Sequence, residues 1–211
     1  MQSEMRKSLN LILKQFSELD YVHPEDIPNI DLYVDQVTTF IESQLSSLKR
    51  DEDEKILTKT MINNYTKNHV LPSPDKKKYS KDHVLTLILI YYLKSFLSIK
   101  DIQTLLEPIT DKYFGTESEL SFYELYEELV AQGNGQSKAL IKDVIAKYNA
   151  MQNAFSDAPE EDQEFLRNFG FICMLSFDVY IKKMMIETLI DFNSRQRKAA
   201  ADQAKEKKDK S

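Results

Sequence analysis

Hydrophobic positions recur every three or four residues through most of this chain, which is the spacing of one face of an α-helix. Only 4 glycines and 6 prolines occur among 211 residues, which leaves little turn chemistry for an all-β fold. The pattern therefore predicts an all-α protein with at most a small hairpin at residues 71–79. The predicted helices cover residues 1–19, 32–48, 58–68, 80–93, 98–108, 121–132, 140–151 and 160–193.

The predicted helix at residues 58–68 has two faces of opposite character. Thr58 is a good N-cap, and Met61, Ile62 and Tyr65 fall on one arc that would face a core. The opposite arc is polar, has no acid and offers side chains that contact base edges and phosphates. Its residues are Lys59, Thr60, Asn63, Thr66 and Lys67. This division predicts a DNA recognition helix.

A basic loop bracketed by prolines follows this helix. Pro72 and Pro74 prevent a helix, and residues 75–79 (DKKKY) predict a tight exposed turn. Lys76, Lys77 and Lys78 would stand at phosphate height if this loop is the wing of a winged helix.

Two further helices complete the segment. Ser80 is a candidate cap for the first of them, and His83 should close its first turn. Residues 84–93 of this helix are apolar except for one threonine, so the helix should be a buried central strut. Ser98 to Asp101 resembles a capping box that opens a short helix, and Pro108 is expected to end it.

The charge is distributed unevenly. The net charge is −6, yet residues 55–100 contain nine lysines and arginines against two acids. Residues 1–54 have five basic residues against twelve acids, and residues 101–170 have five against fourteen. The basic block therefore coincides with the candidate recognition helix and wing, where phosphate binding needs it. A solvated basic face without a partner is the alternative.

An acidic loop separates the predicted helix at residues 32–48, for which Asp31 is a candidate cap, from the recognition helix. Residues 49–55 read KRDEDEK, with four consecutive acids that would repel a phosphate backbone. Either this loop folds away from DNA, or it shields the basic face until a partner removes it.

The order of these segments resembles the MerR-type winged helix-turn-helix of bacterial transcription regulators. Tyr65 matches the tyrosine that closes the recognition helix, residues 70–72 (VLP) match the segment entering the wing, and residues 99–106 match the helix after the wing. Two positions depart from the pattern: Asn63 stands where an arginine is usual, and His69 stands where a glycine is usual.

The chain is also similar to an uncharacterised bacterial family, number eighteen thirty-six in the domain-of-unknown-function series, known mainly from low-GC Gram-positive bacteria. The similarity extends over about residues 25–130 and implies a fold without an activity. It rests on residues 27–33 (IPNIDLY), 35–37 (DQV), 57–65 (LTKTMINNY) and 76–81 (KKKYSK).

The C-terminal half predicts further helices, of which residues 160–193 form the most apolar after the strut. Apolar side chains lie all around this helix, so it should be covered on most sides. It can belong to a monomer core, to a dimer interface or to the wall of a ligand pocket. MerR-like proteins dimerise through the region after the DNA-binding domain, which favours a homodimer through residues 165–189. Cys173 should be a buried, unreactive thiol.

Chemical motifs of enzymes are missing from the sequence. We find no glycine-rich phosphate loop, no metal-ligand spacing around His69 and His83, and no nucleophile with an obvious base. The sequence therefore predicts no catalytic, cofactor or metal site. Without an apolar run of about 20 residues or a signal-peptide core, a cytoplasmic protein that does not bind membranes is expected.

The resulting prediction is a DNA-binding transcriptional regulator of unknown target. Its domains are an N-terminal helix and linker (1–24), a MerR-like winged helix-turn-helix (25–108), a helical dimerisation or regulatory region (109–194) and a disordered basic tail (195–211). The alternative is a protein-interaction module with a winged-helix fold that does not bind DNA. Partners would be double-stranded DNA, a second copy and a small-molecule or protein effector of unknown identity. The predicted DNA contacts are Lys59, Thr60, Asn63, Thr66, Lys67, Lys76, Lys77, Lys78 and Lys81.

Overall fold

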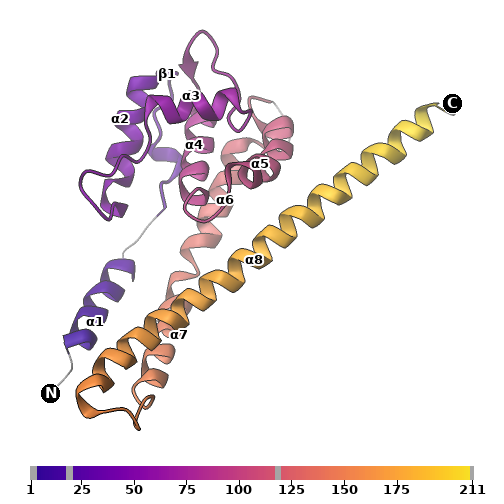
Figure 1. Cartoon of the computed structure of the whole chain (residues 1–211). Coiled ribbons are helices and arrows are strands. Elements are labelled where there is room, and N and C mark those ends of the chain that lie inside the picture. The colour runs from indigo at the N-terminus through magenta and orange to yellow at the C-terminus, as the bar shows by residue number, and fades with distance from the viewer. Residues whose placement is uncertain (1–3, 18–20, 117–119, 210–211) are drawn as a thin grey trace. The chain divides into compact units, whose positions relative to one another are not determined.

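The structure, a computed structural model, describes residues 4–17, 21–116 and 120–209, and this part of the chain is mostly helical (Figure 1). The all-α prediction is confirmed. The helices are α1 (Glu4–Ser17), α2 (Val34–Leu45), α3 (Lys59–Lys67), α4 (Lys81–Leu93), α5 (Ile99–Tyr113), α6 (Phe122–Asn134), α7 (Ser137–Met151) and α8 (Glu160–Asp209), with short 3₁₀ helices at Pro24–Asp26 and Ser46–Leu48. Strands β1 (Leu32–Tyr33) and β2 (Lys78–Tyr79) pair antiparallel.

The described residues divide into two compact units. Unit 1 lies within the segments Met1–Tyr21 and Leu129–Met184, and unit 2 within Val22–Glu128 and Met185–Ser211. The division falls inside α6 and α8. No helix among the described residues is both long enough and apolar enough to cross a membrane.

Unit 2 is built around α4, as its continuous apolar run predicts. Seven of its residues from His83 to Ile90 are buried, and buried Thr86 donates its hydroxyl proton to the Asp82 carbonyl at 2.7 Å. The neighbouring elements bury one face each, which leaves their other faces to solvent. These buried residues are Val37, Ile41 and Leu45 of α2, Ile62 and Tyr65 of α3, Ile102 and Leu106 of α5, and Phe122 and Tyr126 of α6.

Side-chain caps fix where the helices of unit 2 begin. The Met61 N–H donates to Thr58 Oγ1 at 3.1 Å, and the Asp101 N–H donates to Ser98 Oγ at 3.1 Å. A reciprocal capping box joins Ser121 and Glu124 at the start of α6. The α2 cap differs from the prediction: Tyr33, not Asp31, is the N-cap, and its N–H donates to Gln36 Oε1 at 2.8 Å.

The prediction that Pro108 ends its helix is wrong. Helix α5 continues through Pro108 to Tyr113, so the expected boundary between residues 108 and 109 lies inside a helix. Proline removes the N–H that would bond the carbonyl four residues earlier, which belongs to Thr104. The Arg197 guanidinium donates to this carbonyl at 2.9 Å and replaces the missing bond.

The basic tail was predicted to be disordered from residue 195, but α8 continues as a helix to Asp209. Residues 195–207 are exposed, so packing does not explain this helix. Alanine, lysine, glutamate, glutamine and arginine are strong helix formers. Because the preceding turns of α8 already exist, the tail extends a helix and avoids the cost of nucleating one.

The small hairpin expected at residues 71–79 is only part of the observed β structure. Asp75 and Lys78 form one isolated bridge, but strand β2 pairs with β1, which precedes α2: Leu32 lies opposite Tyr79, and Tyr33 opposite Lys78. The loop after α3 is therefore tied to the start of α2.

Unit 1 is a cluster of α1, α7 and the first part of α8. Leu9, Tyr148 and Phe171 form its buried centre, where the two rings meet edge to face at 5.4 Å. Leu19 of the predicted N-terminal stripe lies outside the described residues. Gly170 allows a close approach, since a Cβ there would lie 2.8 Å from Met151 Sδ and 3.1 Å from the Phe155 ring.

The expectation that α8 is covered on most sides is wrong for the single chain. Exposed fractions reach 70% at Phe165, 56% at Phe169 and 63% at Phe177. Cys173 is half-buried, so the expected fully buried thiol is also wrong. In α6, Leu129 is 52% exposed, and Val130 takes the buried position.

Candidate nucleic-acid interface

Helix α3 turns a polar face to solvent, as its sequence pattern predicts. Ile62 and Tyr65 are buried, whereas Lys59, Thr60, Asn63 and Lys67 are exposed. Asn63 therefore has its amide available for a base edge, and the two lysines are available to phosphates, apart from the contact of Lys59 described below.

The end of α3 is a complete Schellman motif. The Val70 N–H donates to the Tyr65 carbonyl at 2.8 Å, and the His69 N–H donates to the Thr66 carbonyl at 3.1 Å. This motif requires a left-handed residue at its turn, and His69 has φ +56°. His69 thus adopts the conformation for which glycine is favoured, and the chain leaves α3 in a fixed direction toward the prolines.

The basic turn, residues Asp75–Lys78, projects from unit 2 beyond α3 (Figure 1). The Lys78 N–H donates to the Asp75 carbonyl at 2.7 Å, and the two central residues have positive φ, +46° at Lys76 and +67° at Lys77. Positive φ at both central residues defines a type I′ turn, which strongly favours Asn-Gly. Lysine in a left-handed conformation costs roughly 1–2 kcal/mol relative to the right-handed one.

Two contacts fix the basic turn against its surroundings. The hydroxyl of Tyr79, at the end of the turn, is hydrogen-bonded to the Thr66 side chain of α3, although burial still raises the pKa of Tyr79. Lys78 Nζ lies 5.8 Å from the centre of the exposed Tyr33 ring. The basic turn and α3 are therefore held next to each other by side chains as well as by the β1–β2 pair.

Not all predicted DNA contacts are free to bind. Lys59 forms an ion pair with Asp35 in the first turn of α2. Thr66 is half-buried and bonded to Tyr79. Lys81 is half-buried, with Nζ 4.6 Å from the Tyr123 ring of α6. The exposed predicted contacts that form no ion pair or ring contact with the described part of the chain are Thr60, Asn63, Lys67, Lys76 and Lys77.

The acidic loop is anchored at the far end of α4 from the basic turn. Lys94, just after the last residue of α4, donates to the Ile56 carbonyl at 2.6 Å. The pKa of Tyr91, in the last turn of α4, is raised mainly by burial and in addition by the negative charge of Glu54. Lys49 pairs with Glu42 of α2. Because α4 begins at Lys81, next to the basic turn, the 13 residues of α4 separate the acids from the lysines. The acidic loop is therefore held at the end of α4 opposite the basic turn.

His83 closes the first turn of α4, as predicted. The Ser80 N–H donates to His83 Nδ1 at 3.0 Å, and Ser80 Oγ lies 2.8 Å from the same nitrogen. Nδ1 therefore accepts, and the imidazole is neutral with its proton on Nε2. Burial lowers the pKa of His83, and the ring packs edge to face against Phe114 at 4.6 Å.

Some residues of this surface escaped the sequence analysis. Asn64 of α3 and Asn68, the residue just after this helix, are exposed and line a hollow of about 490 Å³ beside Ile99. Asn63 and Asn64 are consecutive in the sequence, and this pair could have indicated that Asn64 also belongs to the surface. Asp35 and Tyr33 join the surface only through contacts distant in sequence, which periodicity cannot show. No group of three or more histidine, cysteine or acidic side chains among the described residues could hold a metal ion.

Comparison with known proteins identifies one family. The family model described as a domain of unknown function (DUF1836) matches residues 22–129, just over half of the chain. No curated protein and no solved structure matches the chain.

Proposed function

The chain belongs to the DUF1836 family, and from the surface described above we propose that it binds duplex DNA and acts as a transcriptional regulator. In this proposal α3 enters the major groove, and the basic turn contacts the phosphate backbone. Asn63 and Thr60 read base edges, while Lys67, Lys76, Lys77 and Lys78 neutralise phosphates.

The observation that carries the proposal is the strained basic turn. Two consecutive lysines occupy left-handed positions at which asparagine and glycine would be more stable. Strain at exposed residues suggests a function for the side chains themselves. The turn presents three lysines beside the acid-free face of α3, which is the arrangement that a DNA backbone and groove require.

The finer assignment within this proposal is a MerR-like winged helix-turn-helix. Helices α2 and α3 would be the helix-turn-helix, the basic turn the wing, and α4 and α5 the helices that follow. His69 supports this assignment because it has the glycine-like conformation expected before the wing. The acidic loop makes the connection between α2 and α3 unusually long. Its anchor at Lys94 holds it at the opposite end of α4 from the basic turn, which supports the proposal.

The proposal includes a homodimer formed through α8. Phe165, Phe169 and Phe177 expose more than half of their surfaces, as do Tyr180 and Ile181. An aromatic side chain can bury about 150–250 Å², so this set approaches the roughly 800 Å² that each partner contributes to a standard interface. Phe169→Glu with Phe177→Glu should give a monomer in sedimentation at high micromolar concentration, where the unaltered protein is a dimer. A monomeric unaltered protein would refute the dimer.

The second candidate is a protein-interaction module that retains the fold without binding DNA. It is favoured by the ion pair between Asp35 and Lys59, which places a carboxylate beside α3. In that case the basic turn would bind an acidic protein surface.

Mutations of the basic turn separate the two candidates. Lys76, Lys77 and Lys78 all changed to glutamine should weaken binding to any duplex, and the salt dependence should flatten by about one unit per lost phosphate contact. A matched control changes Lys7, Lys138 and Lys142, three exposed lysines of unit 1, and should bind like the unaltered protein. Equal binding by both triple variants would refute the DNA-binding surface.

Base reading is tested separately on α3. Asn63→Ala should weaken a preferred site by about 1–3 kcal/mol and random duplex little. Asn149→Ala, at an exposed asparagine of α7 in unit 1, is the matched control. An equal loss on both kinds of DNA for Asn63→Ala would contradict base reading by this residue.

A further inference from the structure

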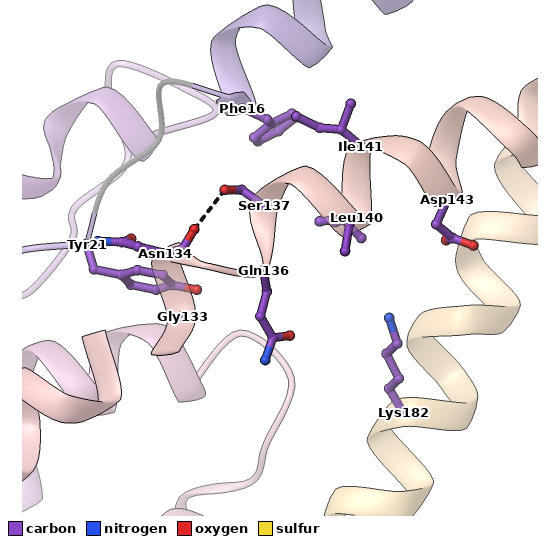
Figure 2. Close-up of a pocket in the computed structure, with 11 residues that line it drawn as sticks. Phe16, Tyr21, Gly133, Asn134, Gln136, Ser137, Leu140, Ile141, Asp143 and Lys182 are labelled. Atoms are coloured by element: carbon purple, nitrogen blue, oxygen red, sulfur yellow. Dashed lines mark hydrogen bonds between the residues drawn. The ribbon is translucent and has the colours of Figure 1, made fainter. Parts of the chain in front are cut away.

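Unit 1 contains two adjoining hollows between α1, α7 and α8. One has a volume of about 590 Å³ and is shown in Figure 2; the other measures about 430 Å³. Phe16, Leu140 and Ile141 line both. The hollows therefore border on the same side chains, and each has the size of a small-molecule site.

The smaller hollow has an entirely apolar lining. Met5, Leu9 and Leu13 of α1 face it from one side, and Phe171 and Leu175 of α8 from another. Side chains at its mouth stay partly exposed: 45% for Ile12, 51% for Phe16 and 57% for Ile172. A concave surface with this much exposed apolar area is stabilised when an apolar group covers it.

The larger hollow adds polar groups at one end. Figure 2 shows Lys182 of α8 extending toward the turn of α7 that carries Asp143, while Phe16 and Ile141 lie at another edge. The Ser137 hydroxyl donates to the Asn134 carbonyl at 3.0 Å and fixes the turn between α6 and α7 that borders the hollow. Gln136 also lines this end.

The charges favour an anion at the polar end. Asp143 is already paired with Lys147, which also contacts Asp178 at 2.7 Å. The hydrogen bond that Lys147 donates to Asp143 is the main reason that the pKa of Lys147 is raised. Lys182 lines the hollow and forms no ion pair with a described residue. It is therefore the cation that remains available to a ligand in this hollow.

We propose that unit 1 binds a single-chain anionic amphiphile, with its aliphatic chain in the apolar hollow and its anionic head at Lys182. Leucine, isoleucine, valine and methionine make up most of the apolar lining, so it fits a flexible chain better than a flat ring system. The head group meets the Lys182 ammonium and the side-chain amide of Gln136. This site lies in unit 1 and does not depend on DNA binding.

Calorimetry of the full chain with decanoate and with 1-decanol, both below the concentration at which they aggregate, tests the site. Decanoate should bind more tightly than the alcohol. Lys182→Gln should weaken decanoate about three- to five-fold, the range of a partly exposed ion pair, and leave the alcohol unchanged. Lys138→Gln, an exposed lysine of α7 outside the hollows, is the charge-matched control and should change neither.

The apolar half is tested with two exposed residues of α7. Leu140, 53% exposed, lines both hollows, whereas Ile145, 40% exposed, lines neither. Leu140→Asp should lower the affinity for both ligands at least about ten-fold, because it would bury a carboxylate against the aliphatic chain of the ligand. Ile145→Asp should leave both affinities unchanged. Circular dichroism confirms that both variants fold. No binding by the unaltered protein, equal effects of the two aspartates, or equal effects of Lys182→Gln on both ligands would overturn the proposal.

Discussion

The Arg197 guanidinium donates a hydrogen bond at 2.9 Å to the carbonyl of Thr104, the residue four positions before Pro108. Pro108 has no N–H for that carbonyl, so a residue near the end of α8 repairs an interruption inside α5. The contact explains why a proline does not stop α5, and it gives the helical tail a structural role in unit 2.

Replacing Arg197 by alanine should therefore destabilise the protein, and the loss should depend on Pro108. Arg197→Ala leaves the Thr104 carbonyl without its partner and should lower the free energy of unfolding by about 1 kcal/mol. In Pro108→Ala the helix supplies its own N–H, so the same arginine change should have little effect. Urea unfolding of the four proteins of this cycle measures the coupling, and additive effects would contradict the repair.

Removing Asp35 should strengthen DNA binding. Asp35→Asn releases Lys59 from its ion pair and removes a carboxylate beside α3. Affinity for duplex should rise about two- to five-fold at about 0.15 M salt, with a steeper salt dependence. Asp53→Asn makes the same charge change in the acidic loop and should have no effect at about 0.15 M salt, where charges beyond about 8 Å are screened. Equal gains from both changes would mean that only net charge matters.

Relieving the strain in the basic turn should separate stability from binding. Lys76→Asn with Lys77→Gly supplies the residues that a type I′ turn favours and should raise the free energy of unfolding by about 1 kcal/mol. The same change should weaken DNA binding and flatten the salt slope by about two units. Thermal unfolding and anisotropy titrations measure the two effects. Lys138→Asn with Lys142→Asn is the control for the loss of two charges. If the variant at Lys76 and Lys77 is more stable and still binds DNA like the unaltered protein, the basic turn does not contribute to DNA binding.

Stability should fall when the pH is lowered from about 7 to about 5.5, and His83 should be a main cause. Burial lowers its pKa in the folded protein, whereas an unfolded histidine titrates near about 6.5. Between these two values the unfolded state holds more protons, so acid favours unfolding by at most about 1.4 kcal/mol per pH unit. His83→Gln keeps an acceptor for the Ser80 N–H and should flatten this dependence. His69→Asn changes a histidine at an exposed left-handed position and should leave the pH dependence of stability unchanged. A pH dependence that is kept in His83→Gln and flattened in His69→Asn would exclude His83 as its cause.

Local signals were enough to predict most of the fold. Thr58, Ser80 and Ser98 cap helices where the sequence predicts them, because a cap and the residue it bonds lie three positions apart. The unbroken apolar run of α4 is also a local signal. A helix that is buried on all sides has no polar face, so this run predicted the buried strut.

Contacts between distant residues account for the errors. The Thr104 carbonyl needs Arg197, and β2 needs β1, so neither the course of α5 nor the strand pairing follows from a window of sequence. At the candidate site, periodicity predicted the exposure of Asn63 and Lys67, whereas the engagement of Lys59, Thr66 and Lys81 depends on partners in other elements. The apolar face of α8 was predicted to be covered, but it is exposed in the single chain.

Selection from a random pool of duplex DNA at about 50 mM salt tests the central claim most directly, because phosphate binding is strong under these conditions. The account predicts that the protein retains duplex and enriches a consensus. It also predicts that Asn63→Ala blurs this consensus, and that the glutamine triple variant at Lys76, Lys77 and Lys78 retains far less DNA. Failure of the unaltered protein to retain any duplex would contradict the DNA-binding function and leave the protein-interaction module in its place.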